Sequence, residues 1–128
     1  MKVTRDPLAP LTVRRISRGE IQIGNESVSH DVLLTVDQAI RPWTASDIAA
    51  LDESDFAPVI ESKPEIIVLG TGWQPRFPPR ELIFAMARRG IGFETMNTPA
   101  ACRTFNILLN EGRRAAAVLI VDDPDDGT

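Results

Sequence analysis

The second half of the chain alternates short apolar runs with longer amphipathic stretches, and this alternation restricts the possible folds more than any other feature. Residues 66–69 read Ile-Ile-Val-Leu, a continuous apolar run that is typical of a strand buried on both faces. The runs at residues 91–96 and 115–121 predict two more strands. The stretches between the three runs are long enough for helices, so we expect parallel strands joined by right-handed crossovers.

Proline and glycine mark the ends of the first predicted helix. Pro78 and Pro79 open it at Arg80, and Gly90 is a suitable residue just past its end. The apolar face of this helix is predicted to consist of Leu82, Ile83, Met86 and Ala87.

The second helix has a strong start signal at Thr98-Pro99. We expect Thr98 to be the N-cap and Pro99 the first helical residue, because proline lacks an N–H that would have no partner there. Gly112 ends the helix. The residues predicted to face the core are Ala101, Phe105, Leu108 and Leu109.

The first half of the chain has the pattern of an antiparallel meander. Strand patterns occur at residues 11–16, 21–23 and 32–36, and Gly24-Asn25 is a hairpin turn signal. A break follows at residues 41–43, after which Thr44 or Ser46 is predicted to cap a helix through Leu51. We therefore expect an α/β domain in which an antiparallel N-terminal β-meander packs with a C-terminal β-α-β-α-β unit of parallel strands. The 128 residues suit a single domain, with residues 1–10 and 122–128 loosely ordered.

Composition and charge exclude several classes of function. The net charge of -4 argues against a nucleic-acid partner, because phosphate neutralisation needs a basic surface. The single cysteine and single histidine exclude a disulfide framework and a cysteine-based zinc site, so we expect neither a metal nor a cofactor. No apolar run approaches the roughly 20 residues of a membrane span. No signal peptide is visible, and we expect a cytoplasmic protein.

The carboxyl ends of the parallel strands are the most promising place for a site, since ligands of open α/β sheets gather there. A glycine loop at residues 70–72 follows the first of these strands, and the helix start at residues 98–103 follows the second. Free N–H groups and the helix dipole at that start favour binding of an anion. An arginine guanidinium can bind the same anion through two of its N–H groups. The candidate ligand-binding residues are Gly70, Thr71, Gly72, Arg76, Thr98, Cys102 and Arg103.

Structural interpretations of the same residues stay open. The glycine loop lacks the third glycine of a dinucleotide fingerprint and the Lys-Ser/Thr of a P-loop, so it is also explained as a tight turn. Trp73 and Phe77 are either exposed contacts for a partner or a cover over the sheet end. Cys102 is either a thiol whose pKa is lowered by the helix dipole or a small buried apolar residue. No nucleophile–base pair or carboxylate pair is present, which argues against an enzyme class.

Residues 92–108, and within them the run Ala-Cys-Arg-Thr-Phe-Asn at 101–106, resemble a known family. The chain is similar to the domain-of-unknown-function family 498/598, related to mitochondrial NADH dehydrogenase (complex I) assembly factor 3. The resemblance implies a three-layer β/α domain with no established catalytic activity. It also implies a role that depends on protein partners. Because no mitochondrial presequence is visible, we expect a free-standing cytoplasmic member.

Two functional hypotheses follow. The first is a non-enzymatic partner-binding domain that resembles an assembly factor. The second is a binder, or an enzyme, that holds a small anion at the Gly70–Gly72 loop and the Thr98–Arg103 helix start. Arg103 is the residue on which the two hypotheses differ most.

Overall fold

The computed structural model describes residues 11–44 and 47–121 and contains two sheets. The segments predicted to be loosely ordered, 1–10 and 122–128, lie outside the described residues. The strands of the smaller antiparallel sheet, in order, are β1 (Val13–Ser17), β2 (Glu20–Ile23) and β3 (Glu26–Val28). The strands of the larger sheet, in order, are β5 (Ile40–Pro42), β4 (Val32–Leu34), β8 (Ala115–Leu119), β6 (Ile66–Gly70) and β7 (Gly92–Met96).

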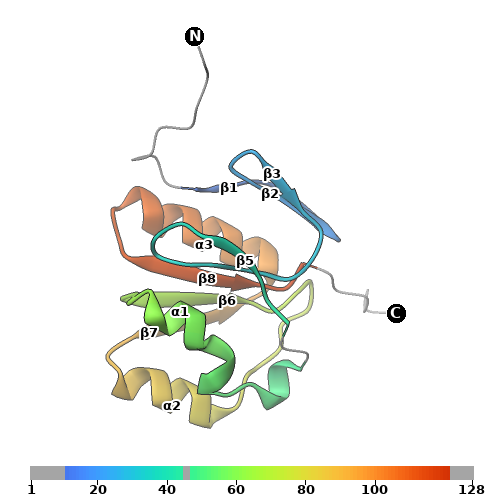
Figure 1. The fold of residues 1–128 in the computed structure, drawn as a ribbon. Helices are drawn as coiled ribbons and strands as arrows, with labels where there is room; N and C mark the ends of the chain where they lie inside the picture. Colours follow the sequence, from blue (N-terminus) through green and yellow to red (C-terminus); the bar gives the residue numbers. More distant parts are fainter. Residues whose placement is uncertain (1–10, 45–46, 122–128) are drawn as a thin grey trace.

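The five-stranded sheet is the middle of three layers (Figure 1). One face is covered by α3 (Thr98–Asn110) and by the small sheet, and the buried side chains of both form one core with the large sheet. The other face is covered by α1 (Ala57–Glu61), α2 (Arg80–Arg88) and the short 3₁₀ helices η1 (Ile48–Ala50) and η2 (Glu53–Phe56). The predicted α/β fold class is confirmed, with β6 parallel to both β7 and β8.

The sheet is buried on both faces, which explains the unbroken apolar runs in the sequence. In β8, Ala115, Ala117 and Leu119 face α3, whereas Ala116 and Val118 face the opposite helices. All five side chains are almost fully buried. A strand of this kind belongs at the centre of a sheet that is covered on both sides.

The segment 32–36 does not continue the meander. Its first three residues form β4, which pairs antiparallel with β8 in the large sheet. Val32 and Leu34 face the layer that contains α3 and the small sheet, whereas Leu33 faces the opposite layer, so this strand also needs cover on both faces. The predicted break at residues 41–43 is wrong at its first two residues, which belong to β5, the edge strand next to β4.

The cap predicted near residue 44 is also different in the structure. Asp47 caps η1, because its carboxylate oxygen accepts a hydrogen bond from the N–H of Ala49 at 3.0 Å. Ser46, the other predicted cap, lies outside the described residues.

The buried face of α2 is rotated from the predicted one. Leu82, Ala85 and Met86 are buried against the sheet. Ile83 and Ala87 were also predicted to face the core, but Ile83 is 39% exposed and Ala87 is exposed as well. Two apolar residues on the outer half of the helix made its apolar face look wider than the core requires.

The side-chain amide of Asn106 joins the small sheet to α3. Its Oδ1 accepts a hydrogen bond from the N–H of Val13, and its Nδ2 donates to the carbonyl of Val13, both at 2.8 Å. The amide therefore pairs with the backbone of β1 in the way that a neighbouring strand would.

We expect Asn106→Ala to lower the free energy of unfolding by about 1–3 kcal/mol, since two partly buried hydrogen bonds are lost. Urea denaturation measures this change. Asn110→Ala is the matched control, because Asn110 is exposed at the last residue of α3. Equal losses in the two variants would show that the amide pairing does not stabilise the fold.

Candidate functional site

The fold brings the two predicted segments together at one edge of the large sheet. In the parallel register Gly70 pairs with Met96 on one side and with Leu119 on the other, so the three strands end side by side. The loop after β6 and the start of α3 leave the sheet at this edge (Figure 1).

Thr98 is fully buried at this edge and connects three parts of the chain. Its hydroxyl accepts a hydrogen bond from the N–H of Gly72 at 2.8 Å and donates one to the carbonyl of Ile120 at 2.7 Å. Its own N–H donates to the carbonyl of Gly72 at 2.7 Å. Thr98 therefore fastens the start of α3 to the loop after β6 and to the chain that leaves β8.

The predicted cap of α3 was wrong by one residue. Asn97 is the N-cap, and its side-chain oxygen accepts from the N–H of Ala100 at 2.9 Å. Thr98 is the first helical residue, with Pro99 next. Asn and Thr both favour the cap, and the buried partners of the Thr98 hydroxyl decide which residue takes it.

Gly70 is required by how closely α3 approaches β6. A Cβ at Gly70 would lie 2.9 Å from Oγ1 of Thr98 and 3.0 Å from Cβ of Ala101. Gly72 has φ 94, a left-handed conformation that favours glycine. The two glycines of the loop are thus explained by packing and by backbone geometry.

Thr71 and Arg76 bond the loop to its own backbone. Thr71 is fully buried, its N–H donates to the carbonyl of Met96 at 2.9 Å, and its hydroxyl donates to the carbonyl of Gln74 at 2.9 Å. Nη1 of Arg76 donates to the carbonyl of Thr71 at 2.8 Å. The guanidinium that was expected to bind an anion is therefore bonded to the loop's own backbone.

The start of α3 has its backbone donors engaged inside the chain. The N–H of Thr98 bonds to Gly72, that of Ala100 to the Asn97 side chain, and that of Ala101 to the Asn97 carbonyl at 2.9 Å. Pro99 has no N–H. Orphan donors are what make a helix N-terminus attract anions, and here they have partners.

Trp73 and Phe77, which follow the same loop, differ in their surroundings. The guanidinium carbon of Arg18, in the turn between β1 and β2, lies 5.8 Å from the centre of the Trp73 ring. That distance is within the range of a cation–π contact. Phe77 is 79% exposed. No sequence signal pointed to Arg18, because the contact depends on how the small sheet lies over the loop.

Cys102 and Arg103 point into different environments. Cys102 is 3% exposed within the core beneath the small sheet, and burial raises the pKa of its thiol from 9.0 to about 12. The thiol is therefore neutral at physiological pH, as the interpretation of a small buried apolar residue requires. Arg103 is exposed.

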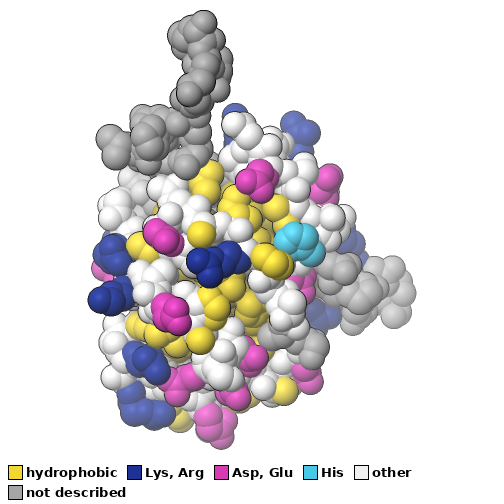
Figure 2. All heavy atoms as spheres, viewed as in Figure 1, with side chains coloured by type: hydrophobic (Ala, Val, Ile, Leu, Met, Phe, Trp, Pro, Cys, Tyr) yellow, Lys and Arg dark blue, Asp and Glu magenta, His cyan; other side chains and the backbone are white. Residues whose placement is uncertain are grey.

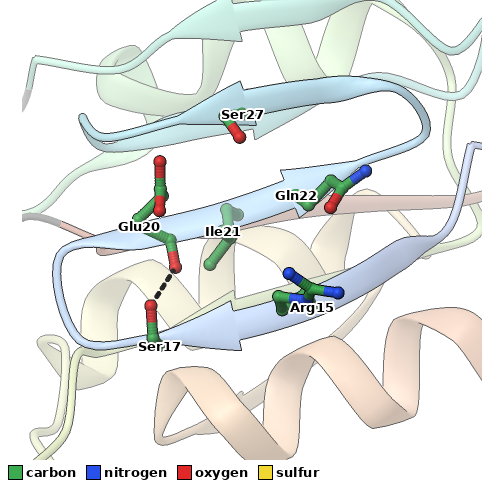
Figure 3. Close-up of a pocket in the computed structure, with 6 residues that line it drawn as sticks. All are labelled: Arg15, Ser17, Glu20, Ile21, Gln22 and Ser27. Carbon is green, nitrogen blue, oxygen red and sulfur yellow. Dashed lines mark hydrogen bonds between the residues drawn. The ribbon is translucent and has the colours of Figure 1, made fainter.

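Three hollows in the described part of the chain lie away from this edge. One of about 50 Å³ is on the outer face of the small sheet, and Figure 3 shows its lining side chains, among them Arg15, Glu20 and Gln22. Its volume holds one or two water molecules and is far below the several hundred Å³ of a typical ligand pocket. Two open grooves, of about 460 and 370 Å³, border η2 and α1.

Within residues 11–44 and 47–121, no group of three or more His, Cys, Asp and Glu side chains is placed to hold a metal ion. In the same residues no helix has the length and apolar character to cross a membrane. On the face drawn in Figure 2, side chains of both charges are mixed, without a broad basic region of the kind that binds nucleic acid.

These features define a small three-layer α/β domain whose sheet edge is closed by its own backbone and side chains. The chain belongs to the family described as "Protein of unknown function (DUF498/DUF598)", whose model matches residues 13–120. The resemblance seen at residues 92–108 is thereby confirmed.

Named relatives extend the comparison. The chain is 36% identical to NADH dehydrogenase [ubiquinone] 1 alpha subcomplex assembly factor 3 of Bos taurus, over 95% of this chain and 65% of that protein. It is 28% identical to a "13 kDa major membrane protein" of Francisella tularensis, over 88% of this chain and 92% of that one. A crystal structure of a Bordetella parapertussis protein superposes with a TM-score of 0.81 at 30% identity, over 91% of this chain and 100% of that one.

We expect Thr98→Val to lower the free energy of unfolding by about 3 kcal/mol, because the N–H of Gly72 and the carbonyl of Ile120 lose their partner. Thr98→Ser keeps the hydroxyl and is expected to cost about 1 kcal/mol for the lost methyl group. Urea denaturation of both variants measures the difference. Equal costs would mean that the hydroxyl does not hold the edge together.

We expect the Cys102 thiol to react with a disulfide reagent at pH 8 at least about 100-fold more slowly in the folded protein than in urea. Because its pKa is raised on folding, the neutral thiol contributes stability that is fully present below pH 9.0. This contribution is lost as the pH rises toward about 12. Cys102→Ala should remove that part of the alkaline slope, and an unchanged slope would contradict the assignment.

Proposed function

We propose that this chain is a non-enzymatic protein-binding domain with a role like that of an assembly factor. The observation that carries the proposal is the closed carboxyl edge, where the glycine loop and the start of α3 bind one another. Because the donors of this edge bond within the chain, we expect a partner to contact surfaces elsewhere on the domain. The likeness to assembly factor 3 over 95% of this chain gives independent support.

The chain spans 65% of the length of the bovine assembly factor. The assembly role that the bovine protein's name describes belongs to that whole protein. For the present chain this role is therefore proposed. The cytoplasmic location also stays a prediction, since a Francisella relative is named a membrane protein.

Purification of the tagged, full-length chain under native conditions from the cells that produce it tests the proposal. We expect the chain to elute from a sizing column in a defined complex with one or a few proteins. The tag alone, expressed at the same level, is the control. If the chain elutes at its own mass and retains nothing beyond the control, the partner-binding role is wrong.

The anion-binding hypothesis stays a prediction that a thermal-shift screen can test on the same protein. A ligand present at 100 times its dissociation constant should stabilise the fold by about 2.7 kcal/mol. The probes are inorganic phosphate, nucleotides, sugar phosphates and carboxylates. Stabilisation by one of them that disappears in Arg103→Ala would favour this hypothesis over a partner-binding role at that edge.

A further inference from the structure

The outer face of α2 is apolar and exposed in this structure, although helices of a sheet protein normally expose polar residues there. Phe84 is 54% exposed and Ile83 is 39% exposed. Ala87 is also exposed and lies one turn after both of them. Phe77, 79% exposed, lies in the segment that leads into the helix. Large exposed apolar side chains that gather on one element mark a contact surface.

Two arginines flank the exposed aromatic ring. Arg80 and Arg88 are four residues before and after Phe84, so all three lie on one stripe of the helix surface. Both arginines are exposed. Glu81 is on the side of this stripe, which leaves the outer face with an excess of positive charge. Aromatic residues and arginine dominate the binding energy of protein interfaces.

The position of these charges disfavours a second copy of the chain as the occupant. If two α2 helices packed antiparallel about Phe84, Arg80 of each would face Arg88 of the other. Parallel packing would place each arginine against its own equivalent. Like charges in direct contact are destabilising. The charges that complement this face are carboxylates on either side of an apolar stripe.

An anionic membrane fits this surface less well than a protein does. The chain has a net charge of -4, so a broad negative surface repels the molecule as a whole. A single helix of a partner approaches only α2 and meets the local positive charge. Phe84 forms a ridge on the helix surface, and the small side chain of Ala87 beside it leaves a groove. Helices pack by fitting ridges of one into grooves of the other.

We propose that the outer face of α2 is the docking surface for an amphipathic helix of a partner protein, with Asp and Glu flanking its apolar stripe. The inference rests on the proposed partner-binding function and adds where the partner binds and which chemistry it has. Phe84 inserts into the partner's apolar stripe, and Arg80 and Arg88 bond to carboxylates one turn away on each side.

Site-specific photo-crosslinking in the full chain tests the proposal. A benzophenone amino acid is placed at position 84 in one variant and at position 107 in another, and the crosslinked peptides are sequenced. Ile107 is the matched control, because it is 57% exposed but lies on α3, on the other face of the sheet. We expect crosslinks from position 84, and none from position 107, to an apolar segment of helical period that contains more Asp and Glu than Lys and Arg.

Binding of a synthetic peptide with the crosslinked sequence then gives the strength of each contact. Phe84→Ser is expected to weaken binding at least about 10-fold, since aromatic contacts of this kind dominate an interface. Ile107→Ser should change it less than about twofold. Arg80→Glu with Arg88→Glu should also weaken binding about 10-fold, and exchange of the peptide's acidic residues for lysine should restore it. All variants change exposed side chains, and their melting temperatures check that they fold.

Several outcomes would overturn the proposal. They are crosslinks from position 84 to lipid, to the chain itself or to a basic segment, and crosslinks from position 107 instead. If position 84 gives no crosslink while the tagged chain keeps its complex, the partner binds at another surface and the partner-binding function stands. If no variant and no native chain retains a partner, the proposed function fails first and this inference fails with it.

Discussion

The hydroxyl of Thr98 is the interaction on which the carboxyl edge of the sheet depends. It joins the start of α3, the loop after β6 and the chain leaving β8 through two short hydrogen bonds. This is possible only because Gly70 has no side chain and lets α3 lie against β6. Thr98 and Gly70 are therefore two parts of one constraint, and the buried polar groups of the edge have partners only while it holds.

The same constraint explains why the edge resembles a binding site in the sequence. Glycines, a helix start and arginines are the residues that bind an anion, but they are also the residues that close a tight junction between strand and helix. In this protein the helix start bonds to the loop, and Arg76 bonds to the carbonyl of Thr71. The sequence pattern located the two segments that meet at this edge, and it could not show whether their donors face a ligand or one another.

Local patterns predicted most of the fold, because they follow from burial and backbone geometry. The run at residues 66–69 and the punctuation by Pro79, Gly90 and Gly112 located the β-α-β-α-β unit. The errors arose where tertiary contacts override local preference. Asn97 caps α3 because the hydroxyl of Thr98 is engaged elsewhere, and β4 joins the large sheet because both of its faces need cover. The partner of the Thr98 hydroxyl, Ile120, and the partner of β4 in the large sheet, β8, are both distant in sequence.

The error at α2 has a different origin and bears on function. The helix has more apolar residues than its buried face uses, and periodicity alone assigns all of them to one core. Ile83 and Phe84 lie on the face that the sheet does not touch. An apolar residue in a sequence does not by itself show whether its own chain covers it, as the exposed Ile107 also illustrates. On α2, exposed aromatic and aliphatic side chains lie between two arginines, and this grouping, more than any single exposed residue, is the basis for proposing that another molecule covers them.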